Sequence, residues 1–286
     1  MTRAEGGGRF SWRPPITSVS NPIVKEVVRL RDRRHRDSTR TFLVEGFREV
    51  RRALDAGADV ERLFCCPPFY LGRHEPEVTT ALAARGTTVI EMSEAAFRKI
   101  SYRDRPEGLL GVVRQFPTGL DRVPLRRDSL LLVAERIEKP GNLGTMLRTA
   151  DAAGASVVVC DPTTDPFNPN VVRASVGMLF TVPLAVTSTA EAVPWLRGAG
   201  IKIVATSPEA GLTFWQAELR EGVAVVVGSE QYGLSEPWLD AADQVVRIPM
   251  AGATDSLNAA VAAALTLFEA VRQRAAEAGN EQSPIG

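Results

Sequence analysis

The chain has 286 residues, of which 44% are hydrophobic and 24% charged, and its formal net charge is zero, as expected of a globular protein with two domains of ordinary size. The N-terminus lacks the apolar run of a signal peptide, and no stretch reaches the roughly 18 apolar residues of a membrane span, so we expect a cytoplasmic protein without a membrane partner. Cys65, Cys66 and Cys160 form no CxxC pair, and His35 and His74 lie among charged neighbours, which argues against a zinc site, a disulfide framework or a histidine triad.

The N-terminal part of the chain has the pattern of a small α/β domain. The first 20 residues are rich in Gly, Arg and Pro, and we expect them to be flexible. Asn21 followed by Pro22 is typical of a helix N-cap and first turn. Strands are then expected at 41–46, 60–66, 87–92 and 108–116, with helical stretches between them. The alternation predicts a domain over residues 21–116.

This first domain is more basic than the rest of the chain. Residues 1–115 carry 21 Lys and Arg against 15 Asp and Glu, and residues 25–40 alone hold seven basic side chains against three acids. A basic face suits a polyanion such as RNA, and the candidate RNA-binding residues are Arg31, Arg33, Arg34 and Arg36. A helix face that is merely solvated remains an equal alternative.

The C-terminal part of the chain predicts a parallel sheet. Residues 117–128 contain Pro, Gly and charges and are expected to be a linker. Strands rich in Val, Ile and Leu follow at 129–137, 156–160, 182–186, 201–207, 222–230 and 244–250, and such runs are typical of strands buried on both faces. We predict a second domain over residues 129–275, closed by a long helix that begins near Asp255 or Ser256, and a flexible tail over 276–286.

Three segments of the second domain place polar residues or glycine where a strand ends. In the segment 138–154, Asn142 can cap a helix, and Arg148 lies off its buried stripe. Glu230 follows Gly228, where the backbone can approach a ligand closely, and Asn258 is expected in the first turn of the last helix. Open parallel sheets bind ligands at this edge. Each segment alone is also explained by ordinary turns and caps.

Taken together and in this order, the three segments resemble the SpoU (TrmH) branch of the SPOUT RNA methyltransferases. The matching residues are Asn142, Gly144, Arg148, Ala150 and Gly154, then Gly228, Glu230, Gly233 and Leu234, then Ile248, Pro249, Met250, Gly252, Ser256, Leu257 and Asn258. The resemblance covers about residues 16–275 and includes a helix expected over 168–184. The N-terminal part is similar to the family's RNA-binding domain, which has a ribosomal-protein-like α/β fold.

The resemblance implies an α/β fold whose C-terminal, mainly parallel sheet carries a deep trefoil knot. It implies S-adenosylmethionine as cofactor, transfer of its methyl group to a ribose 2′-hydroxyl of structured RNA, a homodimer formed around the knot, and no metal. The implied catalytic residues are Arg148, Asn142, Glu230, Ser256 and Asn258, and the implied cofactor-binding residues are Gly228, Ile248, Leu257, Thr206 and Met250.

Two details of this interpretation come from the residues themselves. A guanidinium stays protonated, so Arg148 is better suited to grip an RNA phosphate and orient the hydroxyl than to accept its proton. In the last helix, Leu257, Val261, Leu265 and Phe268 form an apolar stripe that can face the sheet. The alanines at 259, 260, 262, 263 and 264 would then leave another side open to a partner helix, or they would pack within the monomer.

Other functions remain open at this point. Family members with this two-domain plan act mostly on 23S ribosomal RNA and some on transfer RNA. The Arg- and Ala-rich composition suggests a high-GC organism, and the plan is similar to antibiotic-resistance members that methylate a 23S rRNA uridine, so a role in resistance is a further hypothesis. A non-catalytic RNA-binding protein or a nucleotide-dependent metabolic enzyme would be alternatives of another class. The motifs do not encode the target nucleotide.

Overall fold

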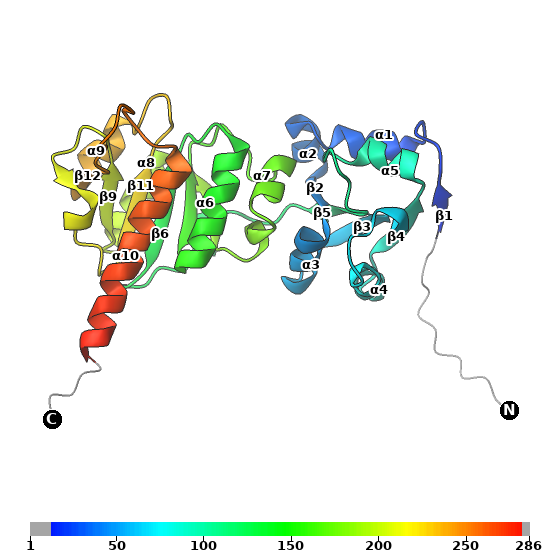
Figure 1. Ribbon diagram of the computed structural model, residues 1–286, viewed down its shortest axis with the longest axis horizontal. Coiled ribbons are helices and arrows are strands. Elements are labelled where there is room, and N and C mark those ends of the chain that lie inside the picture. Colours follow the sequence, from blue (N-terminus) through cyan, green and yellow to red (C-terminus); the bar gives the residue numbers. More distant parts are fainter. Residues whose placement is uncertain (1–12, 282–286) are drawn as a thin grey trace. The chain divides into compact units, whose positions relative to one another are not determined.

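The computed structural model describes residues 13–281, and these form two units, each with its own sheet (Figure 1). The first unit comprises the described residues up to Phe116 together with Phe167–Phe180, and the second comprises Pro117–Pro166 and the described residues from Thr181 onward. Within the described range, no helix is long and apolar enough to cross a bilayer, and no group of three or more His, Cys, Asp or Glu is placed to hold a metal ion.

The first unit is a mixed five-stranded sheet covered by helices on both faces. Its strand order is β1-β4-β3-β5-β2, and β5 runs antiparallel to both β2 and β3. The elements are β1 (Arg13–Ile16), α1 (Pro22–Arg29), α2 (Arg33–Thr39), β2 (Thr41–Glu45), α3 (Phe47–Asp55), β3 (Val60–Cys65), η1 (Pro67–Phe69), α4 (Glu75–Ala84), β4 (Thr88–Met92), α5 (Glu94–Ile100), β5 (Leu109–Arg114), α7 (Pro169–Ala174) and η3 (Met178–Phe180).

The expected strands and the first helix of this unit are confirmed. The Asn21 side chain accepts a hydrogen bond from the Ile23 backbone N–H at 2.8 Å, as a helix cap does. The expectation that the first 20 residues are flexible is wrong for the described part of this stretch. Residues 13–16 form β1, which pairs with β4 in parallel, and the buried Ile16 joins the core between the sheet and α1 and α5. Residues 1–12 lie outside the described range.

A cluster of four phenylalanines holds residues 167–180 on the first unit. The rings of Phe42 on β2 and Phe167 are 4.9 Å apart, and those of Phe116 and Phe167 are 5.1 Å apart, while Phe180 stacks on Phe42 at 6.0 Å.

The expected helix over 168–184 is wrong in extent. α7 ends at Ala174 because Val176 and Gly177 have positive φ angles of 53° and 79°, which an α-helix cannot accommodate.

The second unit is a seven-stranded sheet in which every pairing between its described strands is parallel, in the order β10-β12-β9-β11-β6-β7-β8. The elements are η2 (Leu120–Arg122), β6 (Leu130–Glu135), α6 (Pro140–Ala153), β7 (Ser156–Cys160), β8 (Leu184–Thr187), α8 (Thr189–Gly198), β9 (Lys202–Thr206), β10 (Leu212–Thr213), η4 (Phe214–Gln216), β11 (Val223–Val227), α9 (Glu236–Ala241), β12 (Gln244–Arg247) and α10 (Ala259–Glu281).

The parallel sheet expected from the Val-rich strands is confirmed, and helices cover both of its faces. α6 and α10 lie together on one face, and α8 and α9 on the other (Figure 1).

The expected linker 117–128 is in fact packed: Val123 is buried in the core beneath α8 and α9, and the Val186 N–H donates to the Thr118 carbonyl at 2.7 Å. The expected flexible tail is also partly wrong, since α10 continues to Glu281 and residues 282–286 lie outside the described range.

The two faces of α10 are the reverse of those expected. The alanines at 259, 260 and 263 are buried within the unit, because small side chains let the long helix approach the sheet and α6 closely. The apolar side chains of Val261, Leu265 and Phe268 are instead 45%, 40% and 47% exposed. The described chain therefore leaves an apolar stripe uncovered on the outside of the second unit.

Candidate functional site

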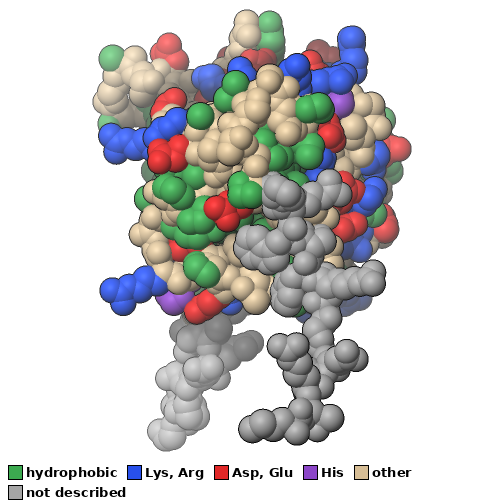
Figure 2. Space-filling view, turned by 90° about the vertical axis from the view of Figure 1, so that its right-hand side faces the viewer, with side chains coloured by type: hydrophobic (Ala, Val, Ile, Leu, Met, Phe, Trp, Pro, Cys, Tyr) green, Lys and Arg blue, Asp and Glu red, His purple; other side chains and the backbone are tan. Residues whose placement is uncertain are grey.

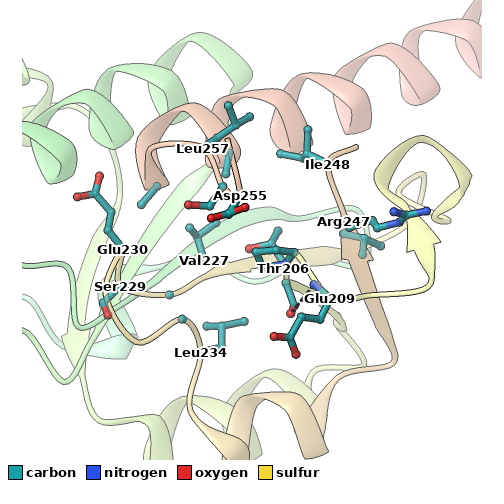
Figure 3. Close-up of a pocket in the computed structure, with 18 of the residues that line it drawn as sticks. Thr206, Glu209, Val227, Ser229, Glu230, Leu234, Arg247, Ile248, Asp255 and Leu257 are labelled. Atoms are coloured by element: carbon teal, nitrogen blue, oxygen red, sulfur yellow. Dashed lines mark hydrogen bonds between the residues drawn. The ribbon is translucent and has the colours of Figure 1, made fainter. Parts of the chain in front are cut away.

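The carboxyl ends of β9, β11 and β12 enclose a cavity of about 690 Å³ in the second unit, a volume typical of a ligand pocket. Parallel strands place the loops that follow them at one edge of the sheet, which is why residues distant in sequence meet here. Ser229 and Glu230 lie at one end of the cavity, and Glu209 and Arg247 lie at the other (Figure 3).

The residues expected to bind the cofactor all line this cavity. They are Thr206, Gly228, Ile248, Met250 and Leu257. Leu257 and Ile248 lie on one side, above Thr206 and Val227 in Figure 3. Apolar walls around exposed backbone suit an adenine ring, which packs against the side chains while its nitrogens bond to main-chain groups. The size and the lining of the cavity fit S-adenosylmethionine.

Gly228 is required by the loop itself. A Cβ atom at this position would lie 2.2 Å from the carbonyl oxygen of Gly233 and 2.5 Å from the Leu234 nitrogen, and neither backbone atom can move aside easily. The loop folds back because Ser229 and Gly233 exchange two backbone hydrogen bonds of 3.2 and 3.0 Å. The close approach predicted at Gly228 is therefore made by the chain's own backbone.

Four polar side chains meet at the Glu230 end of the cavity. The Glu230 carboxylate accepts hydrogen bonds from the Asn142 amide at 2.9 Å and from the Asn258 amide, and it pairs with the Lys139 ammonium. Asn258 also donates to the Asn142 side-chain oxygen at 3.1 Å. We call Lys139, Asn142, Glu230 and Asn258 the polar cluster. Two sequence segments thus converge on the carboxylate of a third.

The polar cluster favours the ionised form of Glu230. The hydrogen bond from Lys139, then that from Asn142, lowers the pKa of Glu230 below its ordinary value, and the same bond raises the pKa of Lys139. The carboxylate can therefore accept hydrogen bonds at neutral pH and can hold two amide side chains in fixed orientations. Each amide keeps further hydrogen-bonding capacity toward a ligand.

The local structure around two cluster members differs from the expectation. Asn142 does not cap α6, which begins at Pro140 after Lys139, so its side chain lies within the first turn and is free to reach Glu230. Asn258 does not lie inside the last helix. It precedes Ala259, and its side-chain oxygen accepts the Ala260 N–H at 3.0 Å, while its amide group faces the cluster.

Two expected catalytic residues do not join the polar cluster. Ser256 lines the cavity, but it is exposed and its hydroxyl makes no hydrogen bond to another described residue. Arg148 is exposed on α6, six residues after Asn142 and so about 9 Å further along the helix axis. No hydrogen bond or ion pair within the described chain holds its guanidinium, which leaves all of its donors available to an outside partner.

The expected RNA-binding arginines have different roles in the first unit. Arg36 is buried and donates to the carbonyls of Leu30 and Arg31 at 3.0 and 2.8 Å, so its inclusion was wrong: a guanidinium fixed in the interior cannot reach RNA. The Arg31 guanidinium is committed to backbone, with its shortest bond, 2.6 Å, to the Ser101 carbonyl. Arg33 and Arg34 are exposed and remain candidates. Figure 2 shows one face of this unit, where Lys and Arg side chains are interspersed with Asp and Glu around hydrophobic and uncharged ones.

The sequence interpretation missed two residues near the cavity. Lys139 directly precedes Pro140, the first residue of α6, and its ammonium pairs with Glu230. Its place in the loop between a strand and the first motif helix could have marked it as a candidate site residue. Glu135 gave no such signal, because it closes an apolar strand. It is fully buried, and its carboxylate accepts from both the N–H and the hydroxyl of Ser235, at 2.9 and 2.6 Å, which anchors the loop from Gly228 at its far end.

Comparison with known families identifies both parts of the chain. Residues 129–268 match the SpoU rRNA Methylase family, and residues 21–111 match the MRM3-like substrate binding domain.

Individual relatives extend these matches over nearly the whole chain. A 23S rRNA (uridine(2479)-2′-O)-methyltransferase of Streptomyces viridochromogenes is 34% identical over 91% of this chain and 92% of its own. A 23S rRNA (guanosine(2553)-2′-O)-methyltransferase of Bacillus subtilis is 31% identical over 88% of this chain and 97% of its own. The structure of an AdoMet-bound rRNA methyltransferase from Sinorhizobium meliloti has a TM-score of 0.83 and 36% identity, and covers 91% of this chain and 98% of its own. The chain therefore belongs to the SpoU family of rRNA methylases.

Proposed function

We propose that this protein transfers a methyl group from S-adenosylmethionine to a ribose 2′-hydroxyl of 23S ribosomal RNA. The observation that carries the proposal is the meeting of the polar cluster, to which the first motif segment contributes Asn142, with the cavity that the other two motif segments line. Relatives of the same length act on 23S rRNA, and an AdoMet-bound structure has the same fold. Such a substrate would place the protein in the cytoplasm, and the reaction needs no metal.

The site residues divide into a group that would hold the cofactor and a group that would position the ribose. Thr206, Gly228, Ile248, Met250 and Leu257 would hold the cofactor against the ends of the strands. Bound there, S-adenosylmethionine supplies an electrophilic methyl group.

The chain's own contribution to catalysis is mainly placement of the ribose. In-line transfer needs the hydroxyl oxygen aligned with the methyl group, and fixing such an alignment accounts for much of the rate in reactions of this kind. Asn142 and Asn258, oriented by Glu230, would bond to the ribose, and Ser256 lines the cavity that Glu230 also lines.

Arg148 would bind a phosphate of the RNA next to the target ribose and stabilise the charge that develops on the oxygen, and that phosphate or a neighbouring group would take the hydroxyl proton. We expect Arg148→Ala to abolish methyl transfer and to leave the dissociation constant for S-adenosylmethionine, measured by calorimetry, almost unchanged. Near-normal turnover by this variant would exclude the role.

The decisive experiment maps 2′-O-methylation in total RNA from cells with and without the protein. A 23S rRNA ribose that loses its methyl group in the absence of the protein supports the proposal. Loss at a transfer RNA position instead would identify a tRNA methyltransferase. If no position changes and the purified protein fails to bind S-adenosylmethionine, it is a non-catalytic RNA-binding protein. A role in antibiotic resistance stays a prediction, tested by comparing the drug sensitivity of the same two strains.

We also propose that the protein forms a homodimer through the second unit. The exposed apolar stripe of Val261, Leu265 and Phe268 on α10 supports this assignment, because apolar side chains in a row on one helix are typical of a contact surface. Leu265→Asp should give a monomer in sedimentation equilibrium and lose activity with it. A wild-type protein that is monomeric and fully active at micromolar concentration would refute the proposal.

The trefoil knot expected from the family is a further proposal. The order of the sheet supports it, since β12, the last strand in sequence, lies between β9 and β10, and the chain then returns to α6 by way of α10. Stretching single molecules from both ends should leave the unfolded chain shorter than its full contour by the length held in a tightened knot. A fully extended chain would exclude the knot.

A further inference from the structure

The loop after β11 holds a tyrosine in a fixed position at its tip. The loop closes through the two backbone hydrogen bonds between Ser229 and Gly233, and the Ser229 hydroxyl accepts the Tyr232 N–H at 3.0 Å. Gly233 has a φ of 67°, which allows the sharp return of the chain. Hydrogen bonds to the buried Ser229 therefore determine where the backbone of Tyr232 lies.

The side chain of Tyr232 lines the rim of the cavity but is 75% exposed. Among the large hydrophobic side chains of the described chain, only that of Leu71 is more exposed. Exposing an aromatic ring of this size forfeits the free energy that burial would give, so a ring held this way is typical of a binding surface. Most of the side chain is therefore open to a partner from outside the chain.

Tyr232 is also close to the place where the ribose must lie. It follows Glu230 by two residues in the same tight loop, which limits the distance between their Cα atoms to about 7 Å. The polar cluster around Glu230 is where the proposed function positions the 2′-hydroxyl. The base is attached to the sugar carbon next to the one that carries this hydroxyl, so it must lie beside the cluster as well.

We propose that Tyr232 stacks on the base of the target nucleotide, an inference that rests on the proposed function. A nucleotide whose ribose enters a methylation site has left its neighbours in the RNA stack, and an aromatic side chain replaces the lost stacking. Every base has a face that can stack, so this contact places the nucleotide without selecting its identity. Uridine and guanosine would both be accepted by the ring, and the choice between them would be made by other groups.

The test compares Tyr232→Ala with Tyr232→Phe on two synthetic RNA fragments. One fragment carries the nucleotide mapped as the target, and the other has an abasic ribose at the same position. On the first, Tyr232→Ala should lower kcat/KM between about 5- and 150-fold, the loss expected for one stacked base, and Tyr232→Phe should restore it. On the abasic fragment, wild type and Tyr232→Ala should be equal. Leu239→Ala, which removes another exposed apolar side chain of the cavity lining, is the matched control and should not distinguish the fragments.

Each other outcome overturns the inference. Equal activity of wild type and Tyr232→Ala on the first fragment means that the ring does not contact the RNA, and an equal loss on both fragments means that it does not contact the base. Weaker calorimetric binding of S-adenosylmethionine by Tyr232→Ala would place the ring on the cofactor, and loss of a wild-type dimer would place it in the subunit contact. If the wild-type protein methylates no RNA, the proposed function fails, and that result is distinct from all of these.

Discussion

Replacing Glu230 with alanine should separate the stability of the protein from its activity. The substitution removes the acceptor that orients Asn142 and Asn258, and it leaves Lys139 without its partner. A net hydrogen bond contributes about 0.5–1.5 kcal/mol, and the Glu230 side chain is 27% exposed, so water replaces part of what is lost. The two amide bonds together give a destabilisation of about 1–2 kcal/mol.

This loss is small compared with a typical unfolding free energy of about 5–15 kcal/mol, so the Glu230→Ala variant should stay folded at 25 °C, with a Tm lowered by about 2–8 °C. Its activity should fall much further, about 100-fold in kcat/KM, because two amides that position the ribose lose their orientation. Tritium transfer from labelled S-adenosylmethionine to ribosomal RNA from cells lacking the protein measures kcat/KM, and calorimetry measures Tm.

Glu218→Ala is the matched control, since Glu218 is an exposed carboxylate of the same unit that is paired with Arg220 at 2.7 Å and does not line the cavity. It should leave kcat/KM unchanged. The reasoning is refuted if Glu230→Ala keeps kcat/KM within threefold of wild type while its Tm falls. The pKa of Glu230 is lowered in the folded state, so its contribution to stability is present above its ordinary value of 4.5 and is lost as the pH falls further. The difference in Tm between variant and wild type should therefore shrink below pH 4.5.

Gly228→Ala should lower both Tm and the affinity for S-adenosylmethionine, because its Cβ would meet the backbone of the returning loop; unchanged values in calorimetry would contradict that geometry. Arg36→Ala should destabilise the first unit by a few kcal/mol in urea unfolding. Arg34→Ala should instead weaken RNA binding and reduce its salt dependence without changing stability. The opposite pattern would restore Arg36 as an RNA contact. Burial raises the pKa of Cys65 from 9.0 to about 11, so the protonated thiol contributes fully to stability below pH 9, and this contribution is lost as the pH rises to 11. Iodoacetamide at pH 8 should label Cys65 in urea but not in the native protein. Fast labelling of the native protein would contradict the burial of this thiol.

The sequence predicts the strands of both sheets well, because their signal is local. Unbroken runs such as Val223–Val227 are typical of strands buried on both faces, and each was expected where it lies. β10 was missed since it has two residues, and β1 was missed since Pro and Arg dominate it. Such edge strands depend on their neighbours, β12 and β4, which a local pattern does not contain.

The candidate site was predictable in its members but not in its contacts. The resemblance identified Asn142, Glu230 and Asn258, yet their convergence depends on a sheet topology that brings together segments 88 and 116 residues apart. The two kinds of arginine in α2 show the same limit. Arg34 and Arg36 look alike in sequence, and only the packed unit shows that one is exposed and the other bonds to carbonyls in the interior.

The assignment of residues 167–180 to the first unit has a consequence for synthesis on the ribosome. The chain emerges from its N-terminus, but the phenylalanine cluster of the first unit needs Phe167 and Phe180, which follow Phe116 by at least 51 residues. Until those residues emerge, Phe42 and Phe116 have no ring partners from that segment, and β6, α6 and β7 are already being made. The N-terminal unit therefore cannot complete its packing before the next one has begun, which departs from the usual sequence in which domains finish one after another.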